Sequence, residues 1–217
     1  MIKQKSGIYQ LNPEKEIRGY VTILWIGLFL LILNSCGGQH RIIIDQNLED
    51  AIRNEIDKPE GDLDLDDLEG LTELRAEDAG VRSLEGIQHC ENLEHIILDF
   101  NEIDDISNLT GLSELKYLSL YNNNVNDISP LADIPSLEHL SIGDNPVYDL
   151  QPLENLPNLS YIFICSCPVR DLTPLINNQS FDNGDELWIC DLPPNSTELE
   201  NQIQALELKG VFVFLFE

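Results

Sequence analysis

The feature that most constrains this chain is a 22-residue repeat that runs from residue 68 to residue 177. Five copies follow one another without a slip, and apolar residues recur at the same positions in each copy. Two of these columns read Leu74, Ile96, Leu118, Leu140, Ile162 and Val81, Ile103, Val125, Val147, Val169. Self-similarity at a fixed period indicates a solenoid, in which each unit buries its apolar side against its neighbours.

Each copy contains an alternating L-x-L segment, which predicts a short strand with its leucines turned into the core. A unit of this length has no room for a full helix on its far side, so turns and 3-10 segments are expected there. Stacking then places the strands side by side in a parallel sheet over a continuous aliphatic core.

The pattern L-x-x-L-x-x-L-x-L-x-x-N-x-I-x-D-I resembles the leucine-rich repeat, in the short form found in internalin-like bacterial surface proteins. The resemblance implies a leucine-rich-repeat solenoid with a curved parallel sheet on its concave face and turns on its convex face. It also implies a helical cap at the N-terminus and a helix–strand cap at the C-terminus.

Two polar columns agree with this resemblance. Asn101, Asn123 and Asn145 recur at one position, where buried amides are expected to bond the backbone of neighbouring turns. The family uses Cys as a substitute for this Asn, which implies that Cys167 completes the ladder, whereas Ala79 departs from it.

The second column reads Ser83, Asp105, Asp127, Asp149, Asp171. A short acceptor at this position is predicted to cap the convex turn. A row of metal-binding carboxylates is the weaker interpretation, because neighbours lie one strand apart, about 4.8 Å, without a calcium loop. We therefore expect no metal site.

The segments at both ends of the array are expected to cover the open core. Residues 41–67 form the expected N-terminal cap, with a helix over 45–57 and a polar link over 58–67. Residues 178–217 hold a degenerate last repeat and a C-terminal cap. In that cap we expect a helix from Ser196 or Thr197 to just before Gly210, and then a buried strand over 211–216.

Residues 1–35 resemble a lipoprotein-type signal peptide. A cationic start precedes an apolar run from Val21 to Leu33, which at about 13 residues is shorter than the roughly 20 that span a membrane. The run ends in "LNSC", which resembles the bacterial lipobox and implies lipidation of Cys36, with residues 36–40 as a tether. An uncleaved anchor with Cys36 as a passive thiol is the alternative.

The charge balance excludes one class of partner. The chain carries 12 basic and 39 acidic residues, a net charge of −27, and the residues after Cys36 alone carry −29. No basic patch could outweigh this charge, so a nucleic acid is excluded. The hydrophobic content of 42% also excludes an acidic disordered tail.

Strand positions beside the inward leucines are expected on the concave face, and they hold most of the scarce aromatic residues. The candidate ligand-binding residues are His95, Ile97, Tyr117, Tyr121, His139, Tyr161, Phe163 and Trp188. Such a contiguous aromatic row is typical of an interface. The alternative is the ordinary preference of aromatic residues for strands.

The sequence offers little support for catalysis. His95 and His139 lie two repeats apart, about 9–10 Å, which is too far for joint metal ligation or a proton relay. The chain has no phosphate loop, zinc spacing or nucleophile elbow. We therefore expect that the protein is not an enzyme, and that it has no catalytic residues and no cofactor.

Three cysteines remain besides Cys36 and Cys167. Cys90 stands at an aliphatic repeat position and is expected to be a buried hydrophobe. Cys165 and Cys190 share a column on consecutive strands, where neighbouring parallel strands give poor bridge geometry, so we expect two thiols. A disulfide formed in an oxidising compartment is the alternative.

The sequence thus predicts a monomeric, non-enzymatic module that binds a protein or peptide through its concave face. The expected place is the bacterial envelope, outside the cytoplasm, on a lipid anchor. Acidic groups beside the sheet favour a partner with a basic rim. The alternatives are an intracellular regulatory scaffold of a partner enzyme and a structural envelope protein.

Overall fold

A computed structural model describes residues 41–190 and 196–216. The predicted signal peptide, the lipidation site Cys36 and the tether lie outside these described residues. Residues 41–217 form one compact unit, and its core runs without a break from Ile43 to Val211. Because this core is closed by the unit's own elements, we treat 41–217 as a domain that folds on its own. Within the described ranges, no helix is long and apolar enough to cross a membrane.

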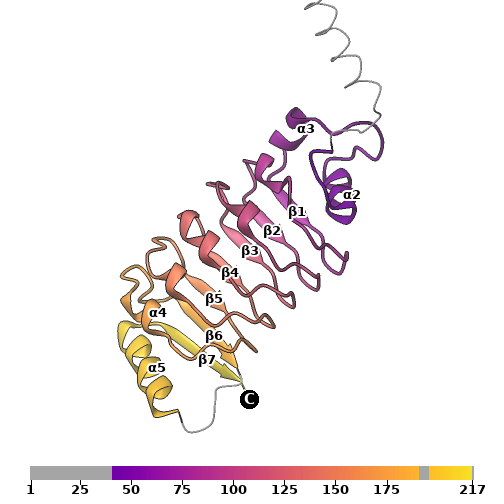
Figure 1. Cartoon of the computed structure of the whole chain (residues 1–217). Coiled ribbons are helices and arrows are strands. Elements are labelled where there is room, and N and C mark those ends of the chain that lie inside the picture. The colour runs from indigo at the N-terminus through magenta and orange to yellow at the C-terminus, as the bar shows by residue number, and fades with distance from the viewer. Residues whose placement is uncertain (1–40, 191–195, 217) are drawn as a thin grey trace, which may run out of the picture. The chain divides into compact units, whose positions relative to one another are not determined.

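Seven strands form one parallel sheet in chain order (Figure 1). They are β1 (Glu73–Arg75), β2 (His95–Ile97), β3 (Tyr117–Ser119), β4 (His139–Ser141), β5 (Tyr161–Phe163), β6 (Glu186–Cys190) and β7 (Phe212–Phe216). Equivalent repeat positions pair directly, as Leu74 does with Ile96 and Leu118 with Leu140. The leucine-rich-repeat solenoid predicted from the 22-residue period is therefore confirmed.

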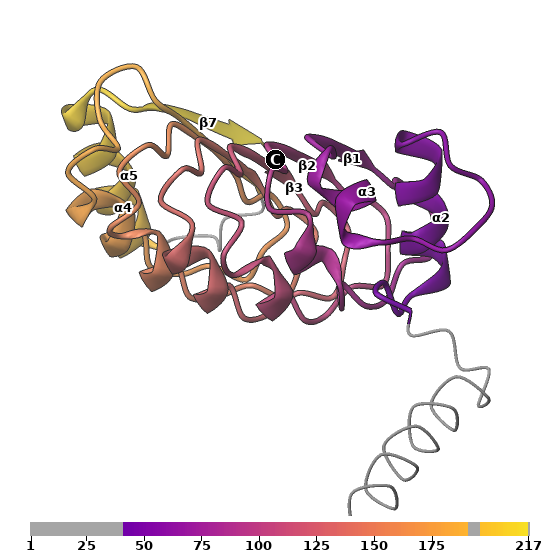
Figure 2. The ribbon, with the colours of Figure 1, turned by 90° about the horizontal axis from the view of Figure 1, so that it is seen from above.

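Short helical segments lie on the side of the coil opposite the strands, as Figure 2 shows. They are η1 (Ile87–His89), η2 (Ser107–Leu109), η3 (Ser129–Asp133), η4 (Gln151–Leu153) and the α-helix α4 (Thr173–Asn177). The Asp column caps these turns, since Asp105 accepts a hydrogen bond of 2.8 Å from the backbone N–H of Ser107 and Asp127 one from Ser129. These carboxylates bond the backbone two residues on, as Asx turns do.

The Asn column forms a ladder inside the coil. The Asn123 amide nitrogen donates to the carbonyl oxygens of Leu98 and Leu120 at 2.9 and 3.0 Å, and its oxygen accepts from the N–H of Ile103 at 3.0 Å. Asn101 and Asn145 make the equivalent bonds. Cys167 keeps one of them, a 3.1 Å contact from its thiol to the carbonyl of Ile142. Burial raises the pKa of this thiol to about 11.

The N-terminal end is covered by two helices, α2 (Gln46–Glu55) and α3 (Leu65–Glu69). Asp45 caps α2 and also accepts hydrogen bonds from the backbone of Arg82 and Ser83, so one carboxylate joins the cap to the first repeat. The polar link expected over 58–67 was wrong in part, because α3 begins inside it. Its signal is a capping box formed by Asp64 and Asp67.

The C-terminal end contains a three-residue insertion, because β6 starts 25 residues after β5 instead of 22. Phe181 fills the added space and is fully buried in a core that is otherwise mostly aliphatic. Helix α5 (Thr197–Lys209) then covers the last repeat, with Ser196 as its N-cap and Gly210 in the left-handed conformation at its end. The Lys209 ammonium donates to the carbonyls of Leu175, Ile176 and Asn178, and burial lowers its pKa.

Two expectations at this end were wrong. The strand over 211–216 exists as β7, but it is an edge strand rather than a buried one, and Phe212 is 58% exposed. Cys165 and Cys190 form a disulfide instead of two thiols. Their Cα atoms are only 4.4 Å apart, which lies at the short end of the range that a disulfide bridges.

Candidate functional site: the concave aromatic face

The concave face carries a row of rings that crosses five strands. His95, Tyr117, His139 and Tyr161 stand at the first position of β2 to β5, and their ring centroids are 6.1, 5.8 and 5.5 Å apart in turn. The row continues diagonally to Trp188 on β6, 6.3 Å from Tyr161. We call these five residues the aromatic row. The 22-residue period places one ring at the same position of each strand from β2 to β5, because the paired register aligns equivalent positions.

The rings at the centre of this row are stacked. The planes of Tyr117 and His139 differ by 25° and those of His139 and Tyr161 by 19°, as in offset stacking. At the two ends of the row the rings are tilted, by 31° between His95 and Tyr117 and by 37° between Tyr161 and Trp188. Ring edges, imidazole nitrogens and tyrosine hydroxyls are left to meet a ligand.

A second group of rings lies beside the row. Tyr121 contacts Phe163 at 6.0 Å, although two repeats separate them along the solenoid. This contact exists because Gly143, two residues after the end of β4, lies between them. A Cβ at Gly143 would lie 2.5 Å from the Phe163 ring, so only glycine lets that ring lean across. Ile97, the remaining candidate, is half-buried on β2.

Phe100 is a member of this second group that the candidate set omits. Its ring meets Tyr121 edge-on at 5.3 Å, and its side chain is 52% exposed. Its backbone is left-handed, with φ of 58°. The same position in the other repeats holds Asp78, Asn122, Asp144 and Ser166, short polar residues of which Asn and Asp tolerate that conformation. The only sequence signal for Phe100 is its contrast with this polar column.

Carboxylates are interleaved with the rings. Asp99 accepts hydrogen bonds from the Ser119 hydroxyl and the Tyr121 N–H, at 2.5 and 2.8 Å. The Tyr121 hydroxyl donates to Asp144 at 2.6 Å, and this hydrogen bond raises the pKa of Tyr121. Glu186 accepts from the Trp188 indole N–H at 3.0 Å. These bonds fix the ring orientations and leave a negatively charged surface around them.

The last strand extends the ring surface beyond the candidate set. Phe214 stacks on Trp188 at 4.3 Å, and Phe216 lies 5.4 Å from the same ring. The repeat pattern could not reveal them, because β7 follows a helix and lies outside the 22-residue register. Alternation along "FVFLF" is the signal that places both rings on the face of Trp188.

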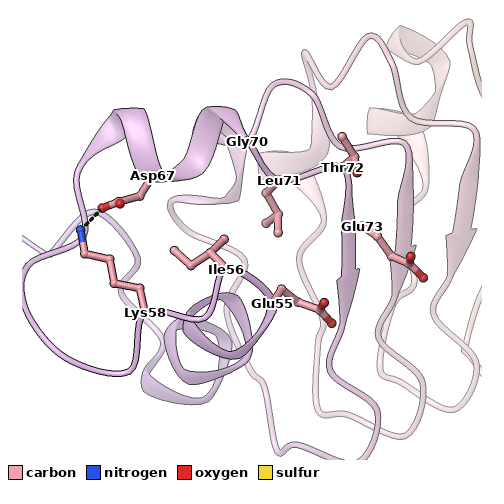
Figure 3. Close-up of a pocket in the computed structure, with 8 residues that line it drawn as sticks. All are labelled: Glu55, Ile56, Lys58, Asp67, Gly70, Leu71, Thr72 and Glu73. Carbon is pink, nitrogen blue, oxygen red and sulfur yellow. Dashed lines mark hydrogen bonds and ion pairs between the residues drawn. The ribbon is translucent and has the colours of Figure 1, made fainter.

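The structure also has an open pocket at the N-terminal cap, of about 410 Å³ (Figure 3). It is lined by residues of α2, α3 and the start of β1, and Lys58 forms an ion pair of 2.5 Å with Asp67 at its side. Its charged side chains are therefore already paired or lie at the open rim. Nothing in it gathers groups for chemistry.

The described residues contain no cluster of His, Cys, Asp or Glu that could hold a metal ion. Burial raises the pKa of the Cys90 thiol to about 12, so this cysteine is a core residue without nucleophilic character. What the site offers is an extended, ring-rich, acidic surface.

Comparison with known proteins identifies the repeat. A family model for leucine-rich repeats, written as two copies of the repeat, matches residues 91–133, 113–147 and 135–177. The chain is a leucine-rich-repeat protein. Among curated protein sequences, no significant match is found.

Solved structures give this leucine-rich-repeat protein an internalin-like fold. The internalin InlF of Listeria monocytogenes is 23% identical over 81% of this chain and 57% of its own chain, with a TM-score of 0.64. A leucine-rich-repeat protein of Leptospira interrogans is 19% identical over 62% of this chain and 40% of its own, with a TM-score of 0.52. Internalin C2 of Listeria monocytogenes is 27% identical over 81% and 95%, with a TM-score of 0.39. The chain thus spans little more than half of InlF.

Proposed function

We propose that this leucine-rich-repeat protein is a non-enzymatic module that binds a protein or an extended peptide through its concave aromatic face. The observation that carries the proposal is the continuous row of aromatic rings from His95 to Trp188. Rings of this kind supply large contact area at low entropic cost, and they are favoured as interface anchors. A core needs none of them, because the leucines on the opposite side of each strand already fill it.

Phe100 supports the same proposal. A bulky residue in the left-handed region costs the folded state energy, and such strain gathers at functional sites. The polar residues at the same position in the other repeats show that the fold itself does not ask for a ring there. An exposed phenylalanine at this place is explained by contact with a ligand.

The stacking geometry favours a protein over a carbohydrate as ligand. Sugar rings pack on the open faces of aromatic side chains, but here the ring faces between Tyr117 and Tyr161 are turned toward neighbouring rings. Hydroxyl groups and ring edges suit backbone groups and side chains of a polypeptide. The carboxylates of Asp99, Asp144 and Glu186 further favour a partner with basic residues at its rim, which would be steered toward the acidic surface.

The proposed place of action is the bacterial envelope outside the cytoplasm, with Cys36 as the lipid anchor. Support comes from the Cys165–Cys190 disulfide, because such bonds persist in oxidising compartments. Cells expressing the full chain should incorporate a clickable fatty acid into it, and the C36S variant should lose the label. An unlabelled chain found in the cytosol would contradict this part of the proposal and favour the intracellular scaffold.

The binding claim is tested by replacing aromatic side chains of the concave face with alanine while the core is left intact. The triple variant H95A/Y117A/Y161A should capture at least tenfold less partner from envelope extracts than the unaltered chain. Tyr148 provides the matched control, because it is 67% exposed and makes no ring contact with the aromatic row. Capture that survives the triple variant, or that falls equally with Y148A, would refute the proposal.

A further inference from the structure

The edge strand β7 carries three of the eight exposed large hydrophobic residues of the described chain. Its five residues, Phe212–Phe216, include no charged group, and three of them are about half exposed: Phe212, Leu215 and Phe216 at 58, 52 and 48%. Both faces of the strand are apolar, since Phe and aliphatic residues alternate along it. An uncharged, proline-free edge strand of this kind is a site for pairing with another chain.

The opposite edge of the sheet, formed by β1, is protected, unlike the edge at β7. Helix α2 packs against β1, as Figure 1 shows, and the Glu55 carboxylate accepts a hydrogen bond of 3.3 Å from the outward N–H of Arg75. β7 is last in the strand order, and no described strand lies beyond it. Among the described residues, the sheet therefore has one edge that no other element of the chain pairs with or caps.

The backbone of β7 shows which groups point to that edge. The N–H of Phe212 donates to the carbonyl of Asp185 on the β6 side, at 2.8 Å. Because the direction of backbone groups alternates along a strand, those of Phe214 and Phe216 also face β6. Those of Val213 and Leu215 then face outward.

The order of side chains in β7 reads the same in both directions when aliphatic residues are treated as one class: Phe, Val, Phe, Leu, Phe. In an antiparallel pair of two such strands centred on Phe214, each Phe faces a Phe and each Val faces a Leu. The outward groups of Val213 meet those of Leu215, which gives four backbone hydrogen bonds with no change of register. Phe214 then faces its own copy at a close, non-hydrogen-bonded position.

We propose that β7 is a homodimerisation edge, through which a second copy of this chain joins the sheet in antiparallel orientation. The pairing is isologous, so it closes at two copies instead of growing into a fibre. It makes one continuous sheet and brings the Phe214 rings, and through them the two Trp188 residues, together across the twofold axis. This departs from the monomer expected from the sequence alone.

Charge sets the conditions of this dimer. The residues after Cys36 carry a net charge of −29, so two copies repel each other at low ionic strength. The joining surface itself has no charge to be screened. Raising the salt concentration should therefore strengthen the dimer, opposite to an interface made of ion pairs.

Sedimentation of the domain 41–217 over a range of concentrations tests the proposal. The unaltered domain should reach a dimer, and L215K should shift the dissociation constant upward at least tenfold because it places two charges at the joint. Leu208 provides the control, since it is 88% exposed on α5 and is not part of β7. L208K should dimerise like the unaltered domain.

Amide hydrogen exchange tests the proposed strand pairing in the unaltered domain, without a variant. The N–H groups of Val213 and Leu215 should exchange more slowly as the concentration rises, while the exchange of Phe214, already bonded to β6, should change little. A monomer at every concentration, an L215K domain that still dimerises, or growth beyond two copies would each overturn the proposal.

Discussion

Single residues in this protein show where folding and binding make different demands. Phe100 holds a left-handed backbone with φ of 58° at a position where other repeats carry Asp, Asn or Ser. Its ring is exposed and contributes to the concave surface beside Tyr121. The residue therefore weakens the fold slightly while it enlarges the proposed binding face.

Phe100→Asn is predicted to raise the free energy of unfolding by about 0.5–1 kcal/mol, because Asn visits the left-handed region more readily than Phe. The same change should weaken partner capture. Denaturant unfolding and capture assays on the same preparations measure the two effects. D78N, at the equivalent position of the first repeat, should leave both unchanged, and a Phe100→Asn variant that loses stability would count against the assigned strain.

Asp45 is a single residue whose charge supports two elements. Burial alone would raise its pKa, but hydrogen bonds from the backbone of Arg82, Leu48, Ser83 and Asn47 lower it below the ordinary 3.8. A carboxylate whose pKa is lower in the folded than in the unfolded chain stabilises the fold at any pH above its unfolded pKa. This stabilisation is lost as the pH falls through the folded pKa.

Asp45→Ala is therefore predicted to cost about 0.5–2 kcal/mol at pH 7, the range of a lost N-cap, and clearly less near pH 2.5. Thermal unfolding at the two pH values measures the difference. D50A removes an exposed carboxylate from the same helix and should change little at either pH. An equal loss for D45A at both pH values would show that the charge has no role.

At the scale of elements, the Asn ladder holds successive repeats together. Each amide satisfies buried backbone groups of its own repeat and of the one before it, as the bonds of Asn123 to Leu120 and Leu98 show. Removing the amide leaves these groups without partners in a dry interior, at about 1–3 kcal/mol for each.

Asn123→Ala is accordingly predicted to lower the free energy of unfolding by at least about 2 kcal/mol. Cys167→Asn should act in the opposite direction, because the thiol makes only one of the donor bonds that Asn145 makes. Denaturant unfolding with an unchanged m-value is the measurement. Asn124, exposed and next to Asn123, provides the control, and an N124A variant as unstable as N123A would contradict the ladder's role.

The elements also show how far sequence reasoning reaches. The L-x-L alternation locates β1 to β5, because a buried residue recurs at the centre of each strand with the 22-residue period. The same alternation in "ELWIC" locates β6, although the period has broken before it. The sequence pattern does not reveal helix α3, since its capping box is built from Asp64 and Asp67 and reads as part of a polar linker. The pattern also does not reveal that β7 is exposed. The alternation in "FVFLF" predicts a strand, but it does not tell whether another layer covers that strand.

The concave surface is predictable only in part for the same reason. The period alone assigns His95, Tyr117, His139 and Tyr161 to one row, and the strand register agrees. It does not reveal that Gly143 opens a path for Phe163 to reach Tyr121, because that contact crosses two repeats. The disulfide also depends on a detail that no pattern carries, the 4.4 Å approach of Cys165 and Cys190.

At the scale of the whole molecule, the disulfide stabilises the end of the solenoid where the period breaks. Cys165 and Cys190 are 25 residues apart and enclose the insertion. Chain entropy assigns a closed loop of this size about 3.5 kcal/mol. C190S should therefore unfold at lower denaturant concentration than the oxidised protein, with a free energy of unfolding that is smaller by about that amount.

Reduction of the unaltered protein should give the same loss, whereas reductant should leave C190S unchanged. Denaturant unfolding with and without reductant makes the comparison. Equal stability of the oxidised and reduced protein would contradict the stabilising role of the bond.

Residues 41–217 are then a capped leucine-rich-repeat solenoid whose concave rings are proposed to meet a protein ligand. Photo-crosslinking in intact cells tests this most directly. A photoreactive phenylalanine replaces either Tyr117, in the aromatic row, or Tyr148, which is exposed outside it. A specific crosslinked protein is expected from position 117 and none from position 148. Equal crosslinking from both positions, or from position 148 alone, would contradict the proposal.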